Sequence, residues 1–323
     1  MKKKQLVIFG LVVLCLIFGE KCPKAEFITQ TQIIMTTTVT IVADASSRDV
    51  QEAFEAIKKV DSLMNHYNPK SEVSILNQCK KAKVSSQLKE VILKALYFSR
   101  ITDGAFDITV GPLVSLWYRM EREKRLPTSE ELENTLSLIG SQDIGIDDNN
   151  VWFKKKGMKL DLGGIAKGYA VDKAIEILKE KGVKNVLVNA GGDMYCLGEG
   201  PQGKWKVGIQ HPRKTREIVE VIEISNRGVA TSGDYHRYYT ILGKRFGHII
   251  NPSTGLPVED IPTSVTIIAS DAITADALAT GVFVLGPRKG MELINTLPQI
   301  EAMIISEKME ILISNGWQDL LIK

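Results

Sequence analysis

The chain has 323 residues, 44% of them hydrophobic and 24% charged, which is the composition of a globular protein with a substantial core and excludes a fibrous or disordered one. Its formal net charge of +3 is small, so no basic surface for nucleic acid is indicated. Away from the N-terminus the only cysteines are Cys79 and Cys196, too few and too far apart for a disulfide framework or a thiolate zinc site.

The N-terminus has the layout of an export signal. Three lysines precede the apolar run 6–18, which is short for a membrane span. Cys15 and Cys22 suggest a lipoprotein, but leucine and lysine precede them where a lipidated cysteine follows a small residue. We therefore expect residues 1–25 to be a signal peptide or a membrane or lipid anchor. Residues 30–323 would then form a domain that is periplasmic or anchored on the outer side of the cytoplasmic membrane.

The first elements are predicted from periodicity. Residues 33–43, "IIMTTTVTIVA", are uncharged and rich in β-branched side chains, which predicts one strand. Apolar residues recur at helical spacing in 47–66 and in 86–102, which predicts two helices. The glycine-containing stretch 102–117 has no clear period and stays unassigned.

The middle of the chain alternates helices and short strands. Thr128 is predicted to cap a helix, because Glu131 stands three residues later. Residues 159–182, "KLDLGGIAKGYAVDKAIEILKEKG", are predicted to form a strand that runs directly into an amphipathic helix, and 184–192 to form the next strand. Strand, helix and strand in so few residues predict a βαβ unit with a right-handed crossover.

The second half is predicted to be mostly strands joined by turns. One strong helix is expected over Ala272 to Leu285, and a shorter helix near Arg288. No internal repeat or linker divides the chain. The sequence therefore predicts a single α+β body with mixed sheets and packed helices.

The glycines of residues 163–168 suggest an anion site that lacks the usual fingerprints. They do not match G-x-G-x-x-G, and Lys167 is followed by Gly168 rather than by the Ser or Thr of a P-loop. Free backbone amides at a helix start, the helix dipole and a lysine nevertheless favour an anion. Close packing of strand and helix would explain the same glycines, and the segment alone leaves both explanations open.

Asp276 and Thr280 stand four residues apart in an otherwise apolar predicted helix, hence on one face. A carboxylate and a hydroxyl directed to one point suit a hard cation such as Mg²⁺. A buried aspartate bonded to its own helix turn is the alternative. Asp271, nearer the helix start, is predicted to be its N-cap.

His248 precedes a turn formed by Asn251, Pro252 and Gly255. A histidine beside an irregular loop can be a general acid or base at neutral pH, but a single histidine is more often a structural hydrogen-bonding residue. Ser232 is not surrounded by a G-x-S-x-G elbow, which favours a tight turn over a nucleophile.

Together these pieces resemble the ApbE family, the FAD:protein FMN transferases, in ordered blocks that cover nearly everything after the N-terminal signal. The blocks are "MTTTVTI" (35–41), "YNPKSEVSILN" (67–77), "TDGAFDITVGPLVSLW" (102–117), "LDLGGIAKGYAVDKA" (160–174), "VNAGGD" (188–193), "VATSGDY" (229–235), "HIINPSTGLPV" (248–258) and "TADALATGVFVLG" (274–286). Any one block is weak evidence, but this many in order form a specific signal.

The resemblance implies Mg²⁺-dependent transfer of FMN from FAD to a Thr or Ser hydroxyl of a target protein, with a phosphoester-linked flavin as product and AMP released. The implied target carries a pattern of the type Asp-x-x-Ser/Thr-x-Ala-Thr. Exported flavin transferases commonly serve membrane electron-transfer complexes, so a membrane electron-transfer subunit is the expected partner.

The resemblance also implies roles for individual residues. The metal would be held by the Ala166 carbonyl, the Asp276 carboxylate and the Thr280 hydroxyl. His248 would be the base that removes the proton of the accepting hydroxyl, a role that Asp276 could share. The implied FAD contacts are Met35 and Tyr67 at the flavin, Ala105, Phe106 and Asp107 at the adenosine, and Asp161, Gly163, Gly164, Lys167 and Ser232 around the phosphates or ribose.

Two rival functions remain at this stage. A Mg²⁺-dependent FAD pyrophosphatase would use the same site and transfer the phosphoryl group to water. A non-catalytic exported FAD-binding protein would keep the pocket without turnover, but the presence of Asp276, Thr280 and His248 argues against it.

Overall fold

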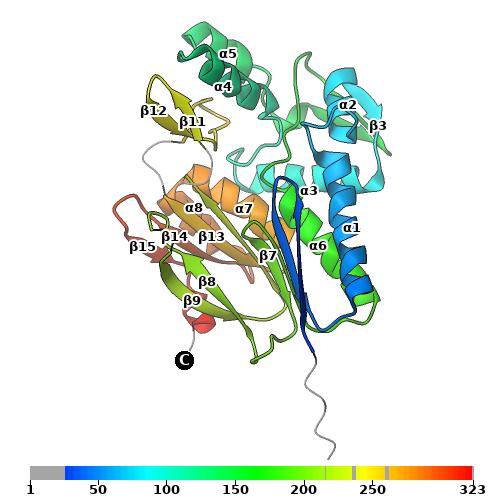
Figure 1. Cartoon of the computed structure of the whole chain (residues 1–323). Helices are drawn as coiled ribbons and strands as arrows, with labels where there is room; N and C mark the ends of the chain where they lie inside the picture. Colours follow the sequence, from blue (N-terminus) through cyan, green and yellow to red (C-terminus); the bar gives the residue numbers. More distant parts are fainter. Residues whose placement is uncertain (1–25, 215, 235–237, 259–261, 322–323) are drawn as a thin grey trace, which may run out of the picture.

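The centre of the molecule is an eight-stranded sheet in which all neighbouring strands are antiparallel (Figure 1). The computed structural model describes residues 26–214, 216–234, 238–258 and 262–321, so the predicted signal or anchor lies outside the described residues. In spatial order the strands are β1 (Ile28–Ile34), β2 (Thr37–Ala43), β6 (Val186–Ala190), β7 (Asp193–Leu197), β10 (Arg227–Gly233), β13 (Ser264–Ala269), β14 (Glu301–Ile305) and β15 (Ile311–Ile313).

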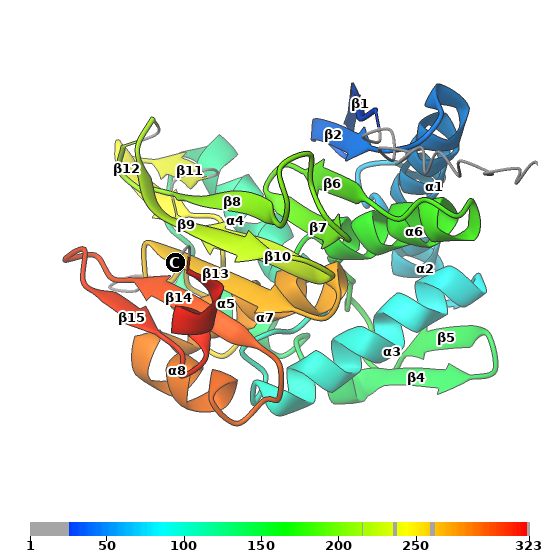
Figure 2. The same cartoon turned by 90° about the horizontal axis from the view of Figure 1, so that it is seen from below.

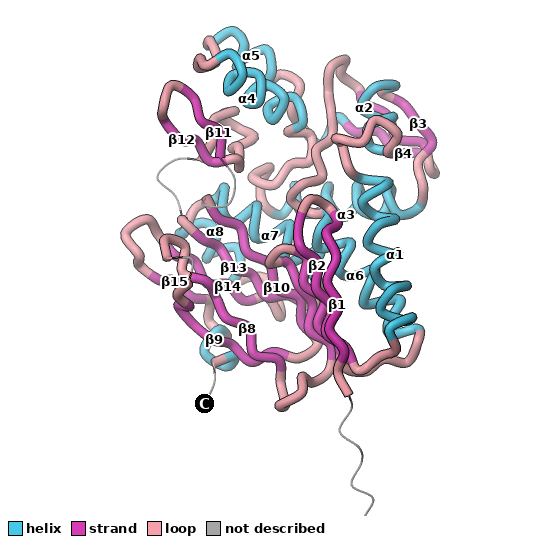
Figure 3. The backbone as a smooth tube through the Cα atoms, viewed as in Figure 1, coloured by secondary structure: helices cyan, strands magenta, loops and turns pink. Residues whose placement is uncertain are grey.

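Helices pack together against one face of this sheet, as the tube view makes plain (Figure 3). They are α1 (Ser47–Met64), α3 (Ser86–Ile101), α6 (Ala166–Glu180), α7 (Ala272–Leu285) and α8 (Pro287–Ile294). Helix α7 crosses β10 and β13, and its sequence is so uniformly apolar that it is buried nearly all round. The main core forms between these helices and the sheet.

The opposite face of the sheet is covered by a two-stranded ribbon, β8 (Trp205–Gln210) and β9 (Ile218–Ile224) (Figure 2). Side chains alternate along β8, so Trp205, Val207 and Ile209 are buried while the residues between them are exposed. They form a second core with Val229 and Ile268 of the sheet.

Two smaller groups of elements complete the fold. The three-stranded sheet β3 (Lys81–Lys83), β5 (Asn150–Phe153) and β4 (Ile144–Asp147) lies beside α2 (Glu72–Cys79). At the top of Figure 1, α4 (Gly111–Glu123) and α5 (Ser129–Leu136) lie near the hairpin β11 (Tyr238–Ile241) and β12 (Lys244–Gly247). Trp117 packs against Tyr239 and Phe246, which joins α4 to this hairpin through a third apolar cluster.

The prediction of one strand over 33–43 is wrong, because the chain turns within it. Met35 and Thr36 have φ of 53° and 58° and form the tight turn of the β1–β2 hairpin. Two consecutive left-handed residues are the mark of a type I′ turn, which suits the twist of paired strands. Neither residue is the glycine, asparagine or aspartate that usually signals such a turn, so the sequence pattern does not predict it.

The predicted βαβ unit is also wrong. Residues 159–164 form no strand, and Lys159 makes only an isolated parallel bridge to Val110. Asn77 explains why: its side chain donates to the Leu160 carbonyl at 2.9 Å and accepts the Leu160 N–H at 2.7 Å. Because the Asn77 side chain satisfies the hydrogen bonds of these backbone groups, the segment does not join the sheet. Strand β6 follows α6 as one of a series of antiparallel strands.

Other predictions are confirmed. The fold is α+β, with mixed helices and sheets; the helix over Ala272–Leu285 is present, and Asp271 caps it by accepting the Thr274 N–H at 2.9 Å. Thr128 and Glu131 form the reciprocal capping box. The unassigned stretch 102–117 contains the start of α4. Among the described residues, no helix is long and apolar enough to cross a bilayer.

Candidate active site

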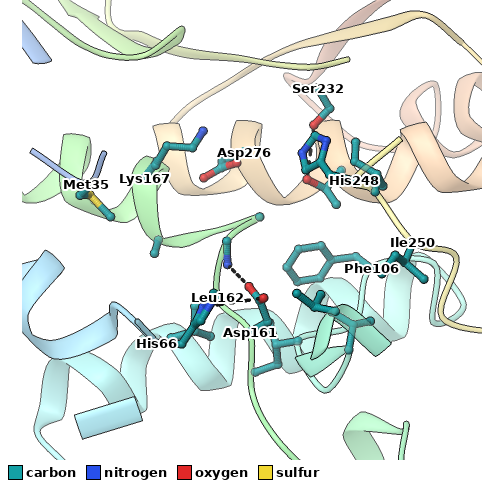
Figure 4. Close-up of a pocket in the computed structure, with 18 of the residues that line it drawn as sticks. Met35, His66, Phe106, Asp161, Leu162, Lys167, Ser232, His248, Ile250 and Asp276 are labelled. Carbon is teal, nitrogen blue, oxygen red and sulfur yellow. Dashed lines mark hydrogen bonds and ion pairs between the residues drawn. The ribbon is translucent and has the colours of Figure 1, made fainter. Parts of the chain in front are cut away.

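A cavity of about 540 Å³ lies where the helical side of the large sheet meets α4 and the loop after β12. It is lined by every residue to which the sequence assigned a site role, although these residues come from segments spread over more than two hundred positions (Figure 4). They are Met35, Tyr67, Ala105, Phe106, Asp107, Asp161, Gly163, Gly164, Ala166, Lys167, Ser232, His248, Asp276 and Thr280.

Helices α6 and α7 meet at Gly168. Its N–H donates to Asp276 Oδ2 at 3.0 Å, which directs the carboxylate from α7 toward the start of α6. A Cβ at position 168 would lie 2.3 Å from the Ala272 carbonyl oxygen, so only glycine permits this approach. The contact also brings Ala166, the first residue of α6, to the same end of the cavity as Asp276.

The Asp276 side chain is almost completely buried, with the residue 4% exposed. Burial, together with the nearby Asp193 carboxylate, raises the pKa of this carboxyl to about 7 against the opposing effect of Lys167. The site thus holds a carboxylate whose charge is poorly solvated and which an added cation would stabilise.

One turn further along α7, the hydroxyls of Ser232 and Thr280 lie close to each other, and the backbone of Gly164 lies close to Thr280. Ser232 Oγ at the end of β10 lies 3.3 Å from Thr280 Oγ1. A Cβ on Gly164 would lie 3.0 Å from Thr280 Oγ1 and 3.3 Å from the Phe106 ring, so a larger residue would crowd this corner. Ser232 is therefore placed as a polar wall of the cavity.

The expectation of free amides at the start of α6 is wrong at three positions. The Gly163 N–H donates to Asp161 Oδ1 at 2.8 Å, the Ala166 N–H to the Leu162 carbonyl at 2.9 Å, and the Gly168 N–H to Asp276. These donors are used to fix the loop and the helix start. An anion in this cavity would therefore depend on side chains and on a cation more than on these three amides.

Lys167 lines the cavity, and its ammonium group is bound by the carboxylate of Asp193, which is not among the lining residues. Asp193 begins β7 and is 2% exposed. A buried carboxylate paired with a partly exposed lysine fixes the position of the ammonium group while leaving it part of the cavity wall.

The Asp107 carboxylate joins its own loop to the segment that begins at Ser141. Oδ1 accepts the Thr109 N–H at 2.7 Å and the Thr109 hydroxyl at 2.6 Å, and Oδ2 accepts the Ser141 N–H at 3.0 Å. Burial raises the pKa of Asp107, and these hydrogen bonds oppose the rise. The side chain therefore holds the turn that brings Ala105 and Phe106 to the cavity.

His248 follows β12 and lies close to Ser232 in Figure 4. The loop behind it is fixed twice: Val258 N–H donates to the Ile249 carbonyl at 3.0 Å, and the Trp117 indole donates to the Gly255 carbonyl at 2.8 Å. Helix α4 and the β11–β12 hairpin thus hold the segment that carries His248, which gives the histidine a defined place in the cavity wall.

The cavity contains residues that the sequence did not reveal. His66 packs against Tyr67 with ring centroids 4.0 Å apart and the rings tilted by 43°, and its Nδ1 lies 3.7 Å from Asp161 Oδ2. Tyr118 joins the same wall. Asp193 ends one of the family blocks, but no pattern in the sequence connects it with Lys167. His66 stands next to a predicted site residue, and that adjacency was the only signal for it.

The oxygen donors fit a hard divalent cation. Within the described ranges no three His, Cys, Asp or Glu side chains cluster as metal ligands. Ala166, Asp276 and Thr280 all line the cavity, and their carbonyl, carboxylate and hydroxyl groups offer one charged and two neutral oxygens. Mg²⁺ commonly takes one or two carboxylates and completes its shell with water and substrate phosphates, so this set suits it.

The ApbE family model matches residues 35–304. The chain belongs to the ApbE family. The resemblance inferred from the sequence blocks is thereby confirmed, and the matched region contains every residue assigned to the site.

Relatives in this family carry the same name and the same fold. The FAD:protein FMN transferase of Haemophilus influenzae is 36% identical over 266 residues, which are 77% of this chain and 76% of the relative. The solved structure of the flavin transferase ApbE from Vibrio cholerae has a TM-score of 0.83 at 32% identity and covers 92% of this chain and 100% of its own. The ApbE protein from Thermotoga maritima has a TM-score of 0.84 at 34% identity, again covering 92% and 100%.

Proposed function

We propose that this protein is an FAD:protein FMN transferase, which moves FMN from FAD to a Thr or Ser hydroxyl of a target protein and releases AMP. One observation carries the proposal: the residues of the ApbE family blocks converge on a single cavity that combines oxygen donors, a lysine, an aromatic wall and a histidine. The name of the relatives supports the same activity.

The metal of the reaction is proposed to be Mg²⁺, held by the Ala166 carbonyl, Asp276 and Thr280. When bound, it would supply positive charge to the phosphates at the bond that breaks. Lys167 lies in the wall next to this group, where its ammonium favours the same phosphates.

The chemical step needs a base for the accepting hydroxyl. The acceptor oxygen forms a bond to the FMN phosphorus, the bond from that phosphorus to the AMP oxygen breaks, and AMP carries away the electron pair. We assign the proton of the hydroxyl to His248, because an imidazole accepts a proton at neutral pH. Asp276 is less suited to this role, since its Oδ2 accepts the Gly168 N–H and its carboxylate is the proposed ligand of the metal.

The flavin is placed at the aromatic wall. Tyr67 is 62% exposed and lines the cavity beside Met35, so both can contact a planar ring system. Phe106 and Ala105 also line the cavity, and the resemblance puts the adenosine half beside them. In Figure 4 Phe106 lies well away from Met35.

We further propose that the acceptor is an exported protein with an Asp-x-x-Ser/Thr-x-Ala-Thr type pattern, such as a membrane electron-transfer subunit. The signal-like layout of residues 1–25 supports an extracytoplasmic site of action, with attachment to the membrane through that segment.

Incubation of the protein with FAD, MgCl₂ and a purified acceptor bearing this pattern tests the proposal. In-gel flavin fluorescence on the acceptor, together with a mass increase by one FMN less one water, is the expected result. An acceptor whose Thr or Ser is replaced by Ala is the matched control, and it should show no flavin fluorescence. Free FMN and AMP without a labelled acceptor would identify a pyrophosphatase instead.

A further inference from the structure

We propose that Asp172, a residue outside the cavity, is a positioning residue that sets the spacing between the metal-holding groups of α6 and α7. The inference rests on the proposed function, because it concerns the Mg²⁺ site named there. Asp172 is not among the residues that line the cavity, so any effect on the metal has to pass through the two helices.

Asp172 on α6 binds the first two amides of α7. Its Oδ1 accepts the Ala272 N–H at 2.8 Å, and its Oδ2 accepts the Ile273 N–H at 2.9 Å. The first amides of a helix have no partner within the helix, and the positive end of the helix dipole favours a carboxylate there. Both oxygens of Asp172 are therefore used to attach the start of α7 to α6.

A second connection lies one turn earlier on α6. The Gly168 N–H donates to Asp276 Oδ2, and the Gly168 backbone approaches the Ala272 carbonyl so closely that no Cβ fits between them. Gly168 and Asp172 are four residues apart and so share one face of α6. The two helices are thus joined at two levels, with the Asp276 carboxylate at one level and the start of α7 at the other.

This arrangement matters because the proposed metal donors are divided between the helices. Ala166 belongs to α6, whereas Asp276 and Thr280 belong to α7. Mg²⁺ demands near-ideal octahedral geometry with short oxygen contacts, so a shift of one helix along the other would misplace at least one donor. Partners that hold ligands in place commonly affect metal affinity 10–100-fold.

Asp271 provides a matched control in the same helix end. It is the N-cap of α7 and accepts the Thr274 N–H at 2.9 Å and a hydrogen bond from the adjacent Ser270 hydroxyl. Among the described residues, its carboxylate has no hydrogen bond to α6. Replacement of Asp271 by Ala takes this cap from α7 without removing a link between the helices. A general effect of helix capping would appear in both variants, and an effect of spacing in Asp172 alone.

Isothermal titration of the full-length wild type, Asp172→Asn and Asp271→Ala with MgCl₂ tests the inference, with thermal unfolding followed in parallel. We expect Asp172→Asn to bind Mg²⁺ at least about tenfold more weakly, and Asp271→Ala to bind it with unchanged affinity. At saturating MgCl₂ the transfer rate of Asp172→Asn is expected to return toward that of the wild type.

A second variant, Asp172→Glu, keeps the charge and both oxygens but lengthens the link. We expect it to restore the unfolding temperature more fully than the Mg²⁺ affinity, which keeps the test valid if the asparagine variant does not fold. Equal Mg²⁺ affinity in all variants, or equal weakening in the Asp172 and Asp271 variants, would overturn the inference. A wild type that transfers FMN but binds no Mg²⁺ would instead refute the metal site itself.

Discussion

The hydroxyl of Tyr67 and the hydroxyl of Tyr118 lie 2.9 Å apart, although 51 positions separate the two residues in the sequence. Tyr67 belongs to the loop after α1 and packs against His66, while Tyr118 lies on α4 and contacts the Tyr239 ring edge-on at 5.3 Å. A continuous aromatic wall thus joins the α1 side of the cavity to the β11–β12 hairpin. It gives the exposed Tyr67 ring a fixed orientation.

Replacement of Tyr118 by Phe should weaken FAD binding and leave the chemical step nearly intact. The variant loses the hydrogen bond that orients Tyr67, and a net hydrogen bond of about 0.5–1.5 kcal/mol at an exposed site corresponds to an affinity loss of about two- to tenfold. Steady-state kinetics with FAD as the varied substrate measure this as a raised KM with kcat unchanged. Tyr97→Phe, an exposed tyrosine outside the cavity wall, is the control. A fall in kcat alone would show that Tyr118 has another role.

Replacement of Asp276 by Asn should abolish transfer without unfolding the protein. The amide oxygen can still accept the Gly168 N–H, and a neutral side chain is tolerated at a buried position that raises the pKa of the carboxyl to about 7. Loss of the charged metal donor is expected to lower the transfer rate at least about 100-fold. Circular dichroism and transfer assays at increasing MgCl₂ check both parts. Activity equal to that of the wild type would contradict the metal assignment.

Replacement of His248 by Asn should slow the chemical step and preserve FAD binding. General-base catalysis contributes about 10²–10⁴-fold, so the rate of transfer is expected to fall by about that factor. The FAD dissociation constant, measured by flavin fluorescence, should change by less than about twofold, which corresponds to about 0.4 kcal/mol of binding free energy. The control is His211→Asn, which changes a histidine outside the cavity wall. If His248→Asn transfers FMN at the wild-type rate, His248 is not the base.

The two cysteines of the described domain should react with iodoacetamide at very different rates. Cys79 is exposed, whereas Cys196 is fully buried in the core below β8, where burial raises the pKa of its thiol to about 12. Only the thiolate is the nucleophile, so Cys196 should be alkylated only after unfolding. Peptide mapping by mass spectrometry distinguishes the two sites. Alkylation of both at one rate in the native protein would show that the β8–β9 ribbon does not cover this face.

Much of the fold follows from patterns among neighbours in the sequence. The predictions fail where the structure depends on contacts that leave no such pattern. The uniformly apolar α7, the capping box at Thr128 and the alternation along β8 depend on interactions between neighbours in sequence, so they are predictable. The type I′ turn at Met35 and Thr36 lacks the usual turn residues, and the pairing of Asn77 with Leu160 joins positions 83 apart. Neither leaves a signal in a single sequence.

The candidate site divides in the same way. Asp276 and Thr280 share a helical face, so their proximity follows from spacing, and the family blocks brought in the remaining residues. The use of the Gly168 amide inside the protein, the Lys167–Asp193 ion pair and the Asp172 link all depend on how α6 meets α7 and β7. Such contacts between distant elements are properties of the packed structure, and the sequence alone could not reveal them.

The stoichiometry of AMP release against acceptor flavinylation tests the central claim most directly. With FAD, MgCl₂ and an acceptor present, we expect one AMP for each flavin attached to the acceptor, and almost no AMP when the accepting hydroxyl is replaced. AMP that forms at the same rate without an acceptor, with FMN left free in solution, would contradict transfer and identify the cavity as the site of FAD hydrolysis.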